Sequence, residues 1–270
     1  MALSVNTNVG SMVALQNLSK TNKSLETTQM RITTGLKVNG PKDDASTYAI
    51  AQNMRGDISG LGAVKTALAN GESVVNTAIE AGQSVADLLT EMKAKVVQAN
   101  QAGLDSASRT ALNNDFNELR SQISTIVATA EFNGTNLING SASTQTVLST
   151  VDGSTISVSA QKMDTTSLSL QSASLLTSAN AASALTLIDT AIRSVSDKLA
   201  ALGSAAKRIE VQGEFTNKLS DILKAGVGNL VDADLAEESA KLQSLQIQQQ
   251  LGTQALSIAN SGPQSILSLF

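Results

Sequence analysis

The chain has 270 residues, a formal net charge of −4 and a sequence pI near 4.9, and it contains no His and no Cys. These absences remove the commonest general base, the thiol nucleophile, disulfides and nearly every zinc or copper site. Aromatic residues make up only 2% of the chain, which suits slender helix bundles better than a compact enzyme fold. We therefore expect no catalytic, cofactor or metal site, and the acidic balance without a basic run argues against nucleic acid as a partner.

No stretch approaches the roughly 20 apolar residues that a membrane-spanning helix needs. The first ten residues, MALSVNTNVG, lack the basic leader and the apolar run of a signal peptide. We expect no membrane insertion and no cleaved signal peptide, while export by another route stays open.

The N-terminal stretch from Val5 to Leu36 is predicted to form an amphipathic helix. Leu18, Leu25 and Ile32 fall seven residues apart, which is the repeat of a coiled-coil seam. A helix with this stripe needs a partner helix.

The next segment, GPKDDAS at residues 40–46, is predicted to separate the first helix from the second. Gly40 and Pro41 end the first helix, and Asp43 and Asp44 are predicted to supply an N-cap and a first-turn negative charge to the next. Three basic residues near this segment are candidates for contacts with acidic residues of neighbouring copies: Arg31, Lys37 and Lys42.

Three further apolar stripes with alternating three- and four-residue steps predict long helices in the middle of the chain. They run from Val75 to Ala99, from Leu112 to Ala130 and from Leu185 to Ile209. Antiparallel neighbours with such stripes can close a shared core. Two Gly-x-Gly fragments lack the third glycine of a dinucleotide loop, and we interpret them as helix bends or ends: Gly60 to Gly62 and Gly226 to Gly228.

Between the second and third of these stripes the chain is rich in Ser, Thr, Asn and Gly. A period of two replaces the helical one, and the pair Asp152 and Gly153 is a type I′ turn signal. A turn there places Val147 opposite Val158 in a β-hairpin within about residues 140–160, with its apolar face on the helices. The insertion is too short for a separate outer globular domain.

The C-terminal stretch from Leu235 to Phe270 repeats the amphipathic pattern, with Glu238, Gln249 and Gly252 as the weak positions. We call its apolar positions, together with those of the first helix, the assembly seam. Its partner is the other end of the same molecule or of a neighbouring copy. The C-terminal members of the seam are Leu235, Leu242, Leu245, Leu256, Ala259 and Ile266.

Four blocks of sequence carry a resemblance to a known family: VNTN at residues 5–8, MRITTGLKVNGPKDDA at 30–45, FNG at 132–134 and QQLGTQALSIANSGPQSILSLF at 249–270. In order and spacing they resemble bacterial flagellin, most closely the short, Caulobacter-like flagellins of alphaproteobacteria. The second block contains the flagellin-like loop motif, formed by Arg31, Gly35, Lys37, Lys42, Asp43 and Asp44.

The resemblance implies a mainly α fold: an elongated rod of long antiparallel helices, one small hairpin, and terminal helices that pair as a coiled coil. Residues 1–42 and 231–270 would form an inner tube and residues 43–230 an outer tube. The implied function is a non-enzymatic structural subunit that polymerises into the extracellular flagellar filament used for swimming. Implied partners are other copies or paralogous flagellins, the export apparatus and its chaperone, filament cap and junction proteins, and O-linked glycan on Ser or Thr.

Other readings remain open at this point. A hook-filament junction protein or another type III secreted coiled-coil protein would share the pattern, and filament formation separates these from a filament subunit. A chemoreceptor-like signalling hairpin would need a membrane anchor or sensory domain. An enzyme built on Ser, Asp, Glu and Lys lacks the α/β pattern that forms a cleft.

Overall fold

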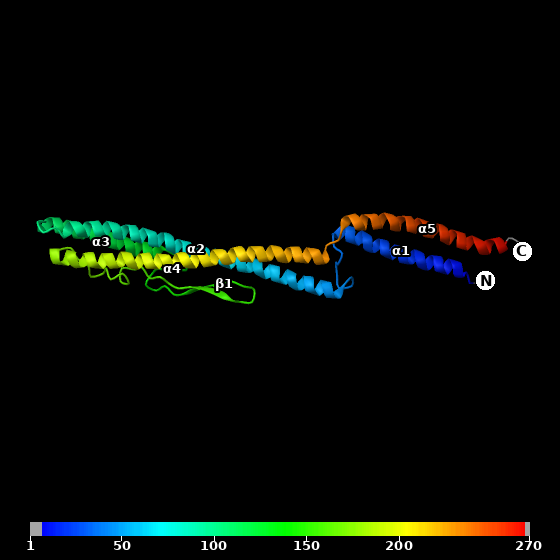
Figure 1. Cartoon of the computed structure of the whole chain (residues 1–270), viewed down its shortest axis with the longest axis horizontal. Coiled ribbons are helices and arrows are strands. Elements are labelled where there is room, and N and C mark those ends of the chain that lie inside the picture. The colour runs from blue at the N-terminus through cyan, green and yellow to red at the C-terminus, as the bar shows by residue number, and fades with distance from the viewer. Residues whose placement is uncertain (1–6, 268–270) are drawn as a thin grey trace. The chain divides into compact units, whose positions relative to one another are not determined.

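The computed structural model describes the backbone of residues 7–267 and the side chains of residues 7–261. Within this part of the chain there are five helices and one two-stranded sheet (Figure 1). The elements are α1 (Val9–Thr34), α2 (Ala45–Ala99), α3 (Ser106–Thr129), β1 (Gln145–Leu148), β2 (Thr155–Val158), α4 (Ser178–Val231) and α5 (Leu235–Leu267). The mainly α fold class with a single small hairpin is therefore confirmed.

The chain divides into two compact units. The terminal unit comprises residues 1–56 and 222–270, and the central unit comprises residues 57–221. Both Gly-x-Gly fragments lie inside long helices, α2 and α4, and neither marks a helix end.

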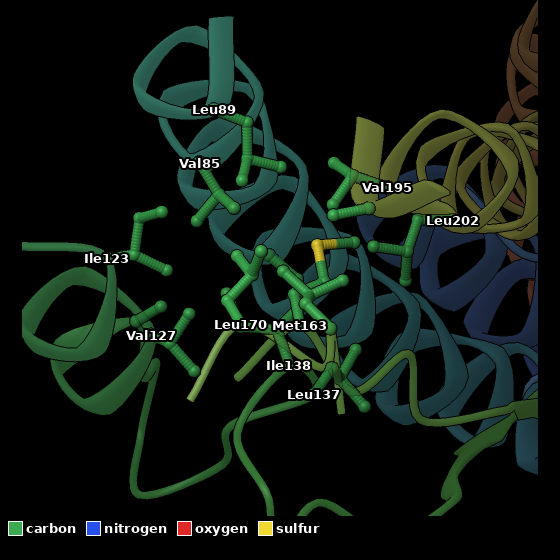
Figure 2. Packing of buried hydrophobic residues seen from close by; sticks show 14 of the residues in the cluster. Val85, Leu89, Ile123, Val127, Leu137, Ile138, Met163, Leu170, Val195 and Leu202 are labelled. Atoms are coloured by element: carbon green, nitrogen blue, oxygen red, sulfur yellow. The ribbon is translucent and has the colours of Figure 1, made fainter. Parts of the chain in front are cut away.

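One hydrophobic core holds the central unit together, as the three predicted stripes require. Apolar side chains of α2, α3 and α4 converge with side chains from the segment between α3 and α4 (Figure 2). Lys93 of α2 pairs with Asp189 of α4 at 2.7 Å, and Lys95 pairs with Asp115 of α3 at 2.7 Å. The labelled core residues are Val85, Leu89, Ile123, Val127, Leu137, Ile138, Met163, Leu170, Val195 and Leu202.

A buried arginine lies at the turn between α2 and α3. The Arg109 guanidinium donates to the carbonyl oxygens of Ala99 and of Gln101, the latter at 2.6 Å. Carbonyls at a helix C-terminus have no partner within the helix, so a cation that donates to them stabilises the end of α2. Asp105 starts α3 by accepting from the Ser108 backbone N–H at 3.3 Å.

The hairpin differs in register from the sequence-based prediction. Val147 lies opposite Ile156, not Val158. A type I′ turn needs positive φ at both central residues, but of the predicted pair only Gly153 has it, with φ of 89°. The chain turns through Thr150 to Gly153 instead, with a 3.3 Å hydrogen bond from the Gly153 N–H to the Thr150 carbonyl. The connection between the strands is therefore longer than two residues.

In the terminal unit, the loop between α1 and α2 corrects another expectation. Asp44 caps α2 by accepting from the backbone N–H groups of Ser46 and Thr47, and hydrogen bonds from the Thr47 side chain and backbone lower the pKa of Asp44. Asp43 does not supply a first-turn charge. Its carboxylate accepts from the N–H groups of residues 39 and 40, at 3.0 and 3.2 Å, because it lies outside the helix and closes the loop.

Candidate assembly interface

The assembly seam brings α1 and α5 together as an antiparallel pair within the terminal unit (Figure 1). Most predicted positions lie on this contact. On α1, Leu18, Leu25 and Ile32 are half-buried, and a Cβ added to Gly252 of α5 would lie 3.1 Å from Leu18 Cδ1. On α5, Leu245 is buried and three further seam residues are half-buried: Leu242, Leu256 and Ala259.

Leu235 does not belong to the contact. Its side chain is 51% exposed. The cross-helix pair of Arg31 with Glu238 places residue 235 opposite Thr34, the last residue of α1, so the partner helix does not continue past this point to cover it. Glu238 occupies the first contact position of α5 instead. The predicted seam residue Ile266 lies outside the described side chains.

Polar contacts form at two of the positions of α5 where the sequence interrupts the apolar pattern. The Arg31 Nη1 donates to Glu238 Oε1 at 2.9 Å, and Gln249 Nε2 donates to Asn22 Oδ1 at 2.8 Å. At the far end the Asn8 side-chain amide donates to the Ala259 carbonyl at 2.7 Å. Polar pairs inside an apolar seam fix the register of the two helices. The weak positions therefore align the pair.

The ion pair between Arg31 and Glu238 is largely withdrawn from solvent. The side chains are 25% and 10% exposed, and Arg31 Nε and Glu238 Oε2 are buried without a hydrogen-bond partner in the described part of the chain. Burial alone would raise the pKa of Glu238. The hydrogen bond from Arg31 and the charges of Lys241 and Arg31 outweigh that effect and hold this pKa below its ordinary value.

The remaining residues of the loop motif shape the backbone beside the seam. Gly35 ends α1 with φ of 72° and donates its N–H to the Arg31 carbonyl at 2.8 Å, a left-handed cap that favours glycine. The Lys37 N–H donates to the Val231 carbonyl at 2.7 Å, whereas Lys42 is exposed and forms no ion pair with any described residue. The structure thus ties part of the motif to the end of α4, just before α5.

Sequence reasoning missed the short bridge between Leu36 and Asp232 and the cap of α5 at Asp234. The Asp234 Oδ1 accepts from the backbone N–H groups of Ala236 and Glu237, at 2.8 and 3.2 Å. An Asp directly before an apolar-periodic stretch is a recognised helix-start signal, so this cap was readable from the sequence. The bridge could not be predicted, because it joins two positions far apart in the chain and no local sequence pattern indicates it.

The outer faces of α1 and α5 carry many apolar side chains. Eighteen large apolar side chains are exposed among the described residues, and nine of them lie on these two helices, which make up far less than half of the chain. Exposure on this scale marks an interaction surface. The nine are Val9, Met12, Val13, Leu15, Met30, Leu235, Ile247, Leu251 and Ile258.

Across the described residues, no helix has the length and apolar character needed to cross a bilayer. The same part of the chain holds no group of three or more acidic side chains placed to bind a metal ion.

Comparison with known proteins matches both ends of the chain to one family. Residues 5–143 match the bacterial flagellin N-terminal helical region, and residues 185–270 match the bacterial flagellin C-terminal helical region. Flagellin FljK of Caulobacter vibrioides is 47% identical, with all of both chains covered. A flagellin of Brucella melitensis is 38% identical, with 99% of each chain covered.

Two solved structures share the fold. The crystal structure of Bacillus cereus flagellin has a TM-score of 0.50 at 23% identity, covering 54% of this chain and 86% of that one. A putative flagellar hook-associated protein from Vibrio parahaemolyticus has a TM-score of 0.58 at 15% identity, covering 70% and 100%. These two likenesses concern the fold alone, whereas the full-length identity to flagellins is specific. The chain belongs to the bacterial flagellin family.

Proposed function

We propose that this flagellin polymerises through the outer faces of its paired terminal helices into the tubular filament of the bacterial flagellum. The observation that carries the proposal is the set of exposed apolar side chains on α1 and α5, which a lone subunit leaves in water. Burying apolar surface contributes roughly 25 cal/mol per Å². Contacts between different faces of successive copies, repeated by a rotation that does not close, build an open helix.

The presence of two units supports a different place for each part of the chain in this filament. Residues 1–42 and 231–270 would line the inner tube, where the seam and its exposed faces lie, and residues 43–230 would form the outer tube. The central unit has a continuous buried core of its own, which supports its stability before assembly. The terminal pair has a narrow seam, so much of the ordering of α1 and α5 would come from contacts made on assembly.

Other implied partners belong to the same proposal. A subunit of an extracellular filament must leave the cell, which supports contact with a flagellar export apparatus and its chaperone. The filament would meet cap and junction proteins at its ends and include paralogous flagellins. Exposed Ser and Thr residues between 135 and 178 offer hydroxyls for O-linked glycan.

Seeded assembly tests the proposal. Heat-dissociated protein is cooled with sheared filament seeds and imaged by electron microscopy, beside a chain that lacks residues 235–270. We expect long hollow filaments from the intact chain alone. An intact chain that stays monomeric in the presence of seeds would remove the proposed function.

A point variant tests the apolar face directly. Ile258 is 72% exposed, so Ile258→Asp should leave the helical content of the monomer unchanged and stop filament growth. Gln246→Asp places the same charge at an exposed polar position of the same helix, about 120° around the helix from Ile258, and serves as the control. Filaments of Ile258→Asp as long as those of the control would show that this face is not the interface.

A further inference from the structure

The methionines are the side chains of this protein that a peroxide oxidises most readily. The chain has six Met and neither Cys nor Trp, so a peroxide meets thioether sulfur and no thiol. The described methionines differ widely in exposure. Met92 and Met163 are buried in the core of the central unit, and Met54 is half-buried. By contrast, Met12 is 62% exposed and Met30 is 47% exposed, and both belong to α1.

Met12 stands on the outer face of α1. It lies six residues before Leu18 of the assembly seam, which is about 120° around the helix, so it is turned away from the contact with α5. Met12 and Leu15 form the apolar end of a hollow of about 520 Å³. Val9 and Val13, on either side of Met12 in the chain, are exposed as well. A peroxide can therefore reach the sulfur, which lies within the apolar face that we expect to be covered in the filament.

Met30 provides a contrast on the same face. It lies 18 residues after Met12, about five helical turns, so the two side chains leave α1 in the same direction. The Asn39 side-chain amide donates to Met30 Sδ at 3.9 Å. An oxygen bonded to this sulfur would keep that amide donor within its own subunit. The exposed apolar neighbours of Met12 offer no such donor.

We propose that Met12 is an oxidation site that controls assembly: a peroxide converts its thioether into a sulfoxide, and subunits that carry the sulfoxide add poorly to a filament. A lone pair of the sulfur attacks one peroxide oxygen, the O–O bond breaks, an S–O bond forms and, after proton transfer, water leaves. The sulfur is oxidised by two electrons and the peroxide is reduced. This inference rests on the proposed function, because it requires that assembly buries the outer face of α1.

The sulfoxide acts by changing the polarity of this face. Oxidation turns a flexible apolar side chain into a polar one. A polar oxygen that is buried among apolar side chains without a donor is destabilising, so the contact between copies should weaken. The same burial should protect Met12 once a subunit is in place. Oxidation should therefore act on the free subunit and spare the finished filament.

Peroxide treatment of free subunits tests the site. Heat-dissociated subunits are treated with hydrogen peroxide and desalted, and their critical concentration for elongation from untreated wild-type seeds is measured. Each variant is compared with its own untreated sample, which removes any effect of the substitution itself. Treatment should raise the wild-type value about tenfold. Met12→Leu should show no rise, whereas Met30→Leu, the matched control on the same face, should rise like wild type.

Peptide mass spectrometry and enzymatic reduction complete the test. Met12 should be oxidised about tenfold more slowly in filaments than in free subunits. Treatment of oxidised wild type with both classes of methionine sulfoxide reductase, one for each sulfoxide epimer, and a thiol reductant should restore the untreated critical concentration. The chain has no Cys, so the reductant has no disulfide of this protein to reduce.

The failure of the inference can be told apart from the failure of the proposed function. Fully oxidised Met12 with an unchanged critical concentration, or an equal rise in Met12→Leu, would overturn the inference while untreated wild-type filaments leave the proposed function intact. Equal oxidation of Met12 in filaments and in free subunits would show that this face stays exposed on assembly. That result, or untreated wild type that does not elongate from seeds, would overturn the proposed function and the inference with it.

Discussion

Val147 of the hairpin occupies the space that a side chain at Gly71 of α2 would fill. A Cβ added to Gly71 would lie 2.5 Å from Val147 Cγ2. The same relation holds at Gly60, where Val151 Cγ1 would be 2.7 Å away, and at Gly82, where Met163 Sδ would be 3.1 Å away. These glycines are eleven residues apart, about three helical turns, so they share one face of α2. That face receives the segment between α3 and α4 at close range.

Gly71→Ala should destabilise the central unit. A clash with a β-branched side chain that is itself buried costs about 1–3 kcal/mol, which exceeds the gain of about 1 kcal/mol in helix propensity. Gly203→Ala is the control, because nothing lies within 4 Å of its added Cβ and it should stabilise α4. Urea unfolding followed by circular dichroism measures both. Equal gains at the two positions would show that the hairpin yields without cost.

Arg109→Ala should destabilise the turn between α2 and α3. The change leaves the carbonyl of Ala99 without the Arg109 donor, at about 1–3 kcal/mol, whereas the carbonyl of Gln101 keeps the Leu104 N–H. Arg208→Ala removes an exposed arginine for which no hydrogen bond to a described residue is found, and it should change the free energy of unfolding by less than about 0.5 kcal/mol. Matching values for the two variants in urea unfolding would contradict the capping role.

The ion pair between Arg31 and Glu238 should make the terminal pair sensitive to acid. Because the pKa of Glu238 in the folded state lies below its ordinary 4.5, its carboxylate stabilises the fold fully above that value. This contribution is lost as the pH falls through the lowered pKa. Glu238→Gln should therefore cost about 1–3 kcal/mol at pH 7 and progressively less as the pH approaches 3.

Thermal loss of helical circular dichroism in assembled protein, recorded from pH 7 to pH 3, measures the difference between wild type and Glu238→Gln. The variant Glu26→Gln, at an exposed glutamate of α1, is the control for general charge loss. A difference that stays constant over this range would mean that ionisation of Glu238 does not stabilise the pair.

The sequence predicts those parts of the fold that repeat. The stripes of α2, α3 and α4 and the seven-residue spacing of Leu18, Leu25 and Ile32 follow from helical geometry, so the structure agrees with them. Leu235 has the correct spacing but lies on the exposed side, because its burial depends on where α1 ends. The period of the apolar residues shows which face of a helix is apolar, but it does not show how far the partner helix extends.

Features that depend on contacts between distant segments could not be predicted in this way. Gly60 looks like a helix bend in the sequence, yet its lack of a side chain accommodates Val151 from the hairpin. Nothing in the sequence distinguishes Arg109 from other arginines in helices. Its role depends on its contact with the end of α2. The predicted hairpin register was wrong for a local reason. Of the two residues predicted to form the turn, the glycine has positive φ and the aspartate does not.

Gln212→Ala should loosen the hairpin from α4. The Gln212 side-chain amide donates to the Ser149 carbonyl at 2.9 Å, directly after β1, and Ser149 is 8% exposed. Loss of a hydrogen bond to a buried carbonyl costs about 1–2 kcal/mol, because that carbonyl is left without a donor. Since a hairpin alone is marginal in water, amide hydrogen exchange across residues 145–158 should become about tenfold faster. Gln83→Ala, at an exposed position of α2, is the control. Exchange rates that match the control, with Gln212 absent, would mean that the glycine face of α2 holds the hairpin without help from α4.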